Sequence, residues 1–396
     1  MNFKFSERIS TLQPSAIREI LKVTQDPTVI SFAAGNPAPE SFPAAEMAEI
    51  AAEIFANDAA SALQYGVSEG YNPLRTLTAK RMKEKYNVGR TFDDTLITSG
   101  GQQVIEMLTK VLVNEGDVIL CEMPSFIGAL NAFRSYNAKL IGIPMDDDGM
   151  DLEVLERTLQ TTKNVKFIYT IPTFQNPSGH VMSLARRKKL LELAETYNVL
   201  ILEDSPYFEL RFAGEYVPPI KSLDETGRVI FSGSYSKVLS PGMRIGFCIA
   251  HKDLVAKLTV AKQVSDVHTN LFFQMIAARF LERHDLDAHI AKICTLYGSR
   301  AQLMCDLIDE KFDGKVRYVR PTGGLFLWCS LPDGYDAMDF CRKTGEKKVV
   351  AVPGSSFSVD EHEVTPTFRM NYSLPSEDQI RTGIDLMADV LKDYVK

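Results

Sequence analysis

From residue 95 onward, short apolar runs alternate with helical stretches along the chain. The apolar runs occupy residues 95–98, 117–121, 138–143, 165–171, 199–202, 229–231 and 245–250. Strands that are apolar on both faces and separated by helices predict a mainly parallel sheet with helices covering its two faces. In such a sheet, the groups that bind or react gather beyond the carboxyl ends of the strands. We therefore expect an α/β protein whose functional residues lie at one edge of the sheet.

The remaining segments predict three parts, with boundaries at residues 1–44, 45–282 and 283–396. The chain has 396 residues, too many for one small core. Five prolines near the start limit any helix there to residues 16–23, which is typical of a surface arm. Beyond residue 254, a long helical region leads to a smaller portion with helices on a mixed sheet. Its expected strands are residues 323–329, 349–352 and 368–372, and further helices are expected at residues 44–57 and 73–85.

Composition excludes several classes of protein. The net charge is −7 with acids and bases interspersed, so no basic face for nucleic acid is expected. The six cysteines form no CxxC pair, which argues against a metal site and against a disulfide framework. The N-terminus lacks the apolar core of a signal peptide, and no run of about 18 apolar residues occurs. No membrane association is expected, and the cytoplasm is the expected location.

Lys237 is the residue that most needs an explanation, because it follows the apolar run at residues 229–231 by only a few residues. Burial lowers the pKa of a lysine, and a neutral amine is a nucleophile. The chemistry that uses such an amine is Schiff-base formation, above all with the aldehyde of pyridoxal phosphate. Ser234, Ser236 and Arg244 would then offer hydroxyls and a guanidinium to the phosphate. The alternative, a loop with a solvated lysine, stays open from this stretch alone.

Three other polar clusters follow apolar runs in the same way. Gly101 and Gln102 join a run to a helix, where free N–H groups and the helix dipole are suited to hold a phosphate. Asn176 belongs to an N-P-S-G turn, and Asp204 and Tyr207 follow the run at residues 199–202. Each cluster also has an ordinary structural explanation, as a glycine turn, an Asn-Pro turn or a turn capped by an aspartate.

In their order and spacing, these motifs resemble the fold-type I pyridoxal-phosphate enzymes, specifically the class I/II aminotransferases. The resemblance covers almost the full length and includes the S-x-S-K-x-x-x-P-G-x-R-x-G block and a late F-R-x-N-Y strand. The openings P-S-A-I-R and S-F-A-A-G-N-P are similar to the branch of 2-aminoadipate and kynurenine aminotransferases. The resemblance implies a large domain with a mainly parallel seven-stranded sheet and a smaller α+β C-terminal domain.

The resemblance also implies a role for each residue of the catalytic centre. Asp204 matches the carboxylate that keeps the pyridine nitrogen of the cofactor protonated, so that the ring accepts electrons when the α-proton leaves. Asn176 and Tyr207 match the donors to the O3′ oxygen. Lys237 matches the covalent anchor, which then carries the proton between the substrate Cα and the cofactor.

The same resemblance assigns the binding residues. It implies that the cofactor phosphate is bound by Gly101, Gln102, Ser234, Ser236 and Arg244, and that Tyr65 of a second subunit also contacts it. A homodimer is therefore expected. Arg369 matches the arginine that binds the substrate α-carboxylate, with Asn176 and Gly35 beside it, although a strand arginine in a surface ion pair is the alternative.

Two residues bear on specificity. Phe126 stands where the family usually carries a tyrosine stacked on the pyridine ring, so stacking is expected without the hydroxyl hydrogen bond. Arg18 in the proline-rich arm matches a residue that contacts a side-chain carboxylate of the substrate, and a solvated helix arginine is the alternative.

The function implied is an aminotransferase that moves the amino group of an aromatic, aliphatic or 2-aminoadipate-like L-amino acid to a 2-oxo acid such as 2-oxoglutarate. The nearest alternative is a β-lyase or decarboxylase on the same fold, because modest pocket changes choose which bond breaks. A ligand-sensing regulator is the third hypothesis, but the residues before Phe42 have neither the room nor the basic charge for a DNA-binding domain.

Overall fold

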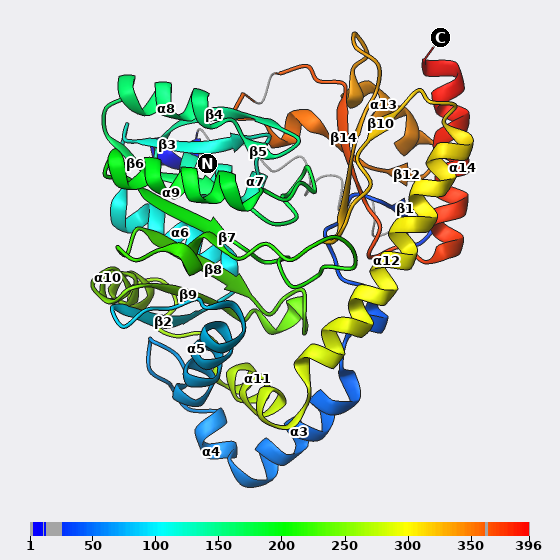
Figure 1. Ribbon diagram of the computed structural model, residues 1–396. Coiled ribbons are helices and arrows are strands. Elements are labelled where there is room, and N and C mark those ends of the chain that lie inside the picture. Colours follow the sequence, from blue (N-terminus) through cyan, green and yellow to red (C-terminus); the bar gives the residue numbers. More distant parts are fainter. Residues whose placement is uncertain (1–2, 11, 13–25, 361–362, 396) are drawn as a thin grey trace.

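The computed structural model describes residues 3–10, 12, 26–360 and 363–395, and it has the expected α/β architecture (Figure 1). Its large sheet has the strand order β2-β9-β8-β7-β6-β3-β4-β5. The strands are β2 (Asp93–Thr98), β3 (Val118–Met123), β4 (Lys139–Asp146), β5 (Gly149–Met150), β6 (Val165–Thr170), β7 (Leu200–Asp204), β8 (Val229–Ser234) and β9 (Gly246–His251). The strands from β8 to β4 are parallel, whereas β9 is antiparallel to both of its neighbours.

All seven predicted strands are present within a few residues of their expected bounds, which confirms the mainly parallel sheet. The eighth strand, β5, has only two residues and pairs antiparallel with β4. Gly149 reverses the chain there with φ = +102°, a conformation that glycine adopts without steric cost. Two residues are too few to show a period, so the sequence carries no signal for β5.

Helices cover both faces of the large sheet. Neighbouring residues of each strand point to opposite sides, and because both are apolar, both faces must be buried. Leu96 packs with one cluster of apolar residues and Ile97 with another. The Leu96 side is covered by α6 (Gly101–Leu112), α7 (Ile127–Arg134) and α10 (Lys252–Gln263). The opposite face is covered by α5 (Asn72–Tyr86), α8 (Leu152–Thr161) and α9 (Leu184–Thr196).

The C-terminal part has a smaller antiparallel sheet in the order β10-β11-β14-β13. Its strands are β10 (Arg317–Tyr318), β11 (Phe326–Ser330), β13 (Val352–Pro353) and β14 (Thr367–Asn371). The helices α12 (Leu286–Lys311), α13 (Ala337–Glu346) and α14 (Glu377–Tyr394) accompany it, and α12 runs from the large part of the molecule to the small one (Figure 1).

The prediction of one strand at residues 349–352 is wrong. β12 (Val349–Val350) pairs in parallel with β1 (Ile30–Ser31), and β13 pairs with β14 in the other sheet. Pro353 has no N–H to extend a ladder, so β13 remains short. The strand expected at residues 323–329 begins only at Phe326, because Gly324 has φ = +74° and turns the chain first.

The remaining elements connect these layers. The α-helices among them are α1 (Glu7–Ser10), α3 (Ala44–Asn57), α4 (Ala59–Ala62) and α11 (Leu271–Arg283). The 3-10 helices are η1 (Pro39–Ser41), η2 (Ile220–Leu223), η3 (Pro241–Met243) and η4 (Gly354–Phe357). The helix predicted at residues 16–23 lies outside the described residues. Within the described part of the chain, no helix combines the length and apolar character needed to span a membrane.

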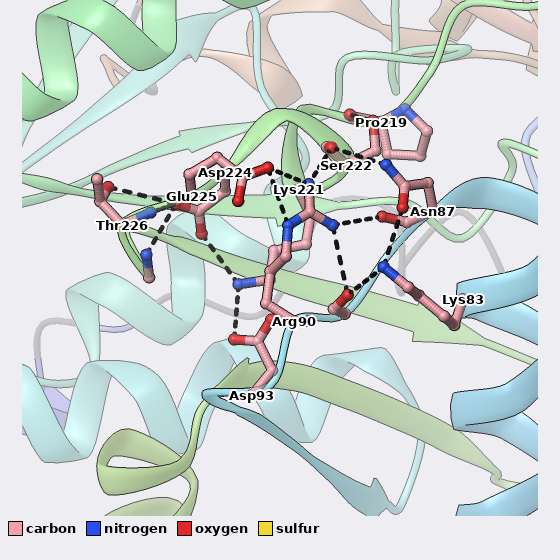
Figure 2. Close-up of polar contacts among 12 residues, drawn as sticks. Lys83, Asn87, Arg90, Asp93, Pro219, Lys221, Ser222, Asp224, Glu225 and Thr226 are labelled. Atoms are coloured by element: carbon pink, nitrogen blue, oxygen red, sulfur yellow. Dashed lines mark hydrogen bonds and ion pairs between the residues drawn. The ribbon is translucent and has the colours of Figure 1, made fainter.

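A buried lysine ties the amino-terminal ends of β2 and β8 together (Figure 2). The Lys221 ammonium is fully buried and donates to Asp93 at 2.8 Å and to Asp224 at 2.9 Å. Arg90 extends the network to Glu225 at 2.8 Å. Because the reactive edge of a parallel sheet is the opposite one, this network serves the stability of the scaffold.

Candidate active site

The carboxyl ends of three strands meet at one edge of the large sheet. Ser234 of β8 and Thr98 of β2 both pair with Gly246, and Asp204 of β7 pairs with Ser232. A cavity of about 390 Å³ opens at this edge. Of the predicted site residues, those that line it are Gly35, Gly101, Gln102, Phe126, Asn176, Asp204, Tyr207, Ser234, Ser236, Lys237, Arg244 and Arg369.

Lys237 projects into the cavity from the loop between β8 and β9. The Tyr235 N–H donates to Ile245 O at 3.1 Å and closes this loop. The Lys237 amine donates to Gly35 O at 2.6 Å. Burial, together with the positive charges of Arg369 and Arg244, lowers the pKa of Lys237 to about 8. Near neutral pH, far more of this amine is therefore neutral and nucleophilic than in an exposed lysine.

Asp204 ends β7 and is buried beside Tyr169. The Tyr169 hydroxyl donates to Asp204 Oδ2 at 2.9 Å. Burial raises the pKa of Asp204 to about 6, and the Tyr169 hydrogen bond opposes that rise. A carboxyl group in this position is suited to pair with a cationic nitrogen of a ligand, because such a partner restores its ionised form.

Hydroxyl, amide and guanidinium donors surround the start of α6, and we call the group Gly101, Gln102, Ser234, Ser236 and Arg244 the anion cradle. Arg244 has φ = +54°, which is uncommon outside glycine, and it donates to Ser99 O at 3.3 Å. Gly100 has φ = +83°, and a Cβ there would lie 2.3 Å from the Arg244 Nη2. Only glycine therefore lets the guanidinium approach the backbone at the helix N-terminus.

Arg369 is buried on β14 at the other side of the cavity. Its guanidinium donates to Asn176 Oδ1 at 2.6 Å and to Ala33 O at 2.8 Å, while its Nε has no hydrogen-bond partner among the described residues. Burial lowers the pKa of Arg369 to about 10, so it is still charged at neutral pH. The surface ion pair considered above is thus excluded, and unused donors remain for a carboxylate ligand.

Two aromatic residues that the sequence did not single out hold Arg369 in place. The guanidinium carbon lies 4.0 Å from the Phe326 ring centroid and 4.8 Å from that of Phe357. Phe326 also meets Tyr207 edge to face at 5.6 Å. In the sequence, both phenylalanines look like ordinary core residues, since nothing local shows which strand lies opposite them.

Glu122, near the end of β3, is a third residue that sequence reasoning missed. It is buried and accepts hydrogen bonds from Ile171 N at 3.1 Å and from Gln175 Nε2 at 3.2 Å. Gln175 Oε1 in turn accepts from Ser178 N at 2.7 Å, which fixes the turn that presents Asn176. Burial raises the pKa of Glu122. Such a buried acid in a run of apolar residues was a visible signal for a hydrogen-bonded role.

Among the described residues, Tyr65 is the one predicted site residue that does not line the cavity. Tyr65 is 81% exposed, with its ring 5.9 Å from that of His268, and it does not line the cavity of this single chain. Arg18 lies outside the described residues, so its contact with a substrate side chain stays a prediction. Phe126 does line the cavity, close to Gly128, where a Cβ would overlap its ring.

Residues 27–386 match the family described as Aminotransferase class I and II. The chain belongs to this family. It is 43% identical to the aromatic-amino-acid aminotransferase 1 of Thermococcus litoralis over 99% of this chain and 95% of that protein. The crystal structure of Pyrococcus horikoshii kynurenine aminotransferase, in complex with PMP, superimposes with a TM-score of 0.95 and 39% identity, covering 99% and 98% of the two chains.

A third relative is the α-aminoadipate aminotransferase of Thermus thermophilus, whose structure contains N-(5'-phosphopyridoxyl)-L-leucine. Its TM-score is 0.91 at 36% identity, and it covers 99% of this chain and 98% of its own. The family resemblance and the fold inferred from the sequence are thereby confirmed. The roles of the individual site residues stay predictions.

Proposed function

We propose that this aminotransferase binds pyridoxal phosphate in the cavity around Lys237 and moves the amino group of an L-amino acid to a 2-oxo acid. The observation that carries the proposal is that a nucleophilic amine, a buried carboxyl group and a buried guanidinium face one cavity. The residues fit the cofactor chemically. The anion cradle suits its phosphate, Asp204 suits its ring nitrogen, and Asn176 and Tyr207 suit its phenolic oxygen.

When bound, pyridoxal phosphate supplies an acceptor for the electrons left at the substrate Cα. Asp204 would hold the proton on the ring nitrogen. Arg369 would bind and orient the α-carboxylate, with its plane fixed by Phe326. With the substrate bound, the free Lys237 amine would take the proton from the substrate Cα.

The proposed donors are aromatic, aliphatic or 2-aminoadipate-like amino acids, and the proposed acceptor is 2-oxoglutarate. A panel of donors labelled with ¹⁵N should be incubated with 2-oxoglutarate and the purified protein. We expect ¹⁵N-glutamate together with the 2-oxo acid of the donor. Release of CO₂ or of a β-substituent without labelled glutamate would instead favour a decarboxylase or a β-lyase.

We also propose a homodimer as the active form. Exposed apolar side chains occur in two segments that meet where the Tyr65 ring contacts His268, and they include Leu63, Tyr65, Val67, Val264 and Val267. Exposed apolar groups of this kind mark an interaction surface. If Tyr65 of one subunit reaches the cradle of the other, sedimentation under assay conditions should show a dimer as the smallest active species. An active monomer would contradict this proposal.

The cytoplasm is the proposed location. All six cysteines are buried as free thiols, which is typical of a reducing compartment. Fractionation of the source cells should recover the protein with the cytoplasmic enzymes.

A further inference from the structure

An ion pair between a buried lysine and a partly exposed aspartate contacts Ser99 and Gln103, beside the anion cradle. Lys262, in the last turn of α10, is fully buried and donates to the Asp266 carboxylate at 2.9 and 3.0 Å. Its ammonium also donates to Gln103 Oε1 at 2.7 Å. None of these three residues lines the cavity. The charge of Lys262 is therefore balanced inside the protein and does not itself attract a ligand.

Each polar group of Ser99 has a partner, and the Asp266 carboxylate reaches Ser99 both directly and through Gln103. Asp266 Oδ2 accepts the Ser99 hydroxyl at 2.6 Å and the Gln103 side-chain amide at 2.8 Å. Gln103 Oε1 accepts the Ser99 backbone N–H at 2.8 Å. The Ser99 carbonyl accepts Arg244 Nη2 at 3.3 Å. The Ser99 hydroxyl also lies 3.2 Å from Thr269 Oγ1. The Asp266 carboxylate thus contributes directly to fixing the residue that supports both the turn into α6 and the guanidinium of the cradle.

Backbone strain next to Asp266 indicates that its position is imposed by these contacts. Val267 has φ = +66°, a conformation that β-branched residues rarely adopt. The N–H groups of Ser265, Asp266 and Val267 all donate to Lys262 O, at 3.0, 3.0 and 3.1 Å. Strain of this kind persists only where the surroundings fix the segment.

We propose that Asp266 is a positioning residue for the cofactor phosphate. It holds Ser99, and through Ser99 the N-terminal turn of α6 and Arg244, in the phosphate-binding arrangement before the cofactor binds. Donors that are already ordered lose less conformational entropy when the ligand binds. The ordering therefore raises the affinity for a ligand that carries a phosphate and leaves the affinity for one without a phosphate unchanged. This inference rests on the proposed function, because it assumes that the cradle binds the phosphate of pyridoxal phosphate.

The test compares two ligands that differ only in the phosphate. Full-length protein freed of cofactor is titrated with pyridoxal phosphate and with pyridoxal, and binding is followed by absorbance. Ser99→Ala removes one hydroxyl and leaves the Lys262–Asp266 pair intact. Asp266→Asn removes the negative charge and replaces one of the two acceptor oxygens by an NH2 donor, which cannot accept from Ser99, Gln103 or Lys262. Ser265→Ala is the matched control, because its hydroxyl lies in the same turn and donates to Ala261 O.

We expect the preference for pyridoxal phosphate over pyridoxal to fall about 5- to 30-fold in Ser99→Ala, as for the loss of one or two hydrogen bonds, with affinity for pyridoxal nearly unchanged. Asp266→Asn should lower the preference at least as much, and Ser265→Ala should retain it. If Asp266→Asn does not fold, Ser99→Ala decides alone.

A preference in Ser99→Ala within twofold of the parent, or equal weakening of both ligands, would overturn the inference. If the parent protein bound neither ligand, the proposed function itself would fail.

Discussion

Arg369→Lys tests how the α-carboxylate of the substrate is recognised. Lysine keeps the positive charge, but it lacks the planar donors that reach Asn176 Oδ1, Ala33 O and a ligand at the same time. The variant loses at least one charge-assisted hydrogen bond to the ligand, and it leaves a buried oxygen of the protein without its donor. Each loss amounts to about 1 to 3 kcal/mol, so the two together should lower transition-state stabilisation by about 2 to 6 kcal/mol and kcat/KM by about 30- to 20,000-fold.

The assay measures steady-state kinetics with leucine and with glutamate as donors, since both carry the α-carboxylate. The two donors should be weakened by similar factors, mainly through KM. Arg211→Lys is the matched control, because Arg211 also stacks on a phenylalanine, 4.7 Å from the ring of Phe174, but does not line the cavity. A kcat/KM within threefold of the parent for both donors, or a loss confined to glutamate, would refute the assignment of Arg369.

Three further predictions follow from the buried charges. Asp204→Asn should leave the fold intact and lower kcat by about 10²- to 10⁴-fold, and a loss below tenfold would remove Asp204 from the site. The pKa of Lys237 is lowered to about 8, and only the neutral amine reacts with an aldehyde. The rate at which cofactor-free protein binds pyridoxal phosphate should therefore rise about tenfold per pH unit below pH 8 and level off above it. A rate that stays constant from pH 6 to 9 would contradict this. Lys221→Met leaves two buried carboxylates without their cation, so we expect a destabilisation of about 3 to 5 kcal/mol and a clearly lower thermal midpoint. Lys189 is exposed, so Lys189→Met should change the thermal midpoint little. Equal midpoints of the two variants would refute the role of the buried network.

The sequence predicted the sheet well because its strands are continuous apolar runs with helices between them. The same pattern predicted where Lys237, Asp204 and Asn176 would meet, since each follows a strand and parallel strands end at the same edge. One polar residue after each apolar run was therefore enough to predict which edge of the sheet carries the site.

What the sequence could not predict depends on contacts between distant segments. Phe326 stacks on Arg369 only because β11 and β14 pair in one particular register, which no local pattern encodes. The split of residues 349–352 between two sheets depends on the pairing of β12 with β1. The network of Lys262 and Asp266 joins the end of α10 to the start of α6, and each residue alone resembles an ordinary surface charge.

Reduction of the purified protein with borohydride tests the central claim most directly. If Lys237 is the amine that holds the cofactor, reduction should abolish activity and leave one phosphopyridoxyl group per chain on the peptide that contains Lys237, as read by mass spectrometry. Lys237→Ala should incorporate none. Attachment of the group to a different lysine, or full activity in Lys237→Ala, would contradict the account.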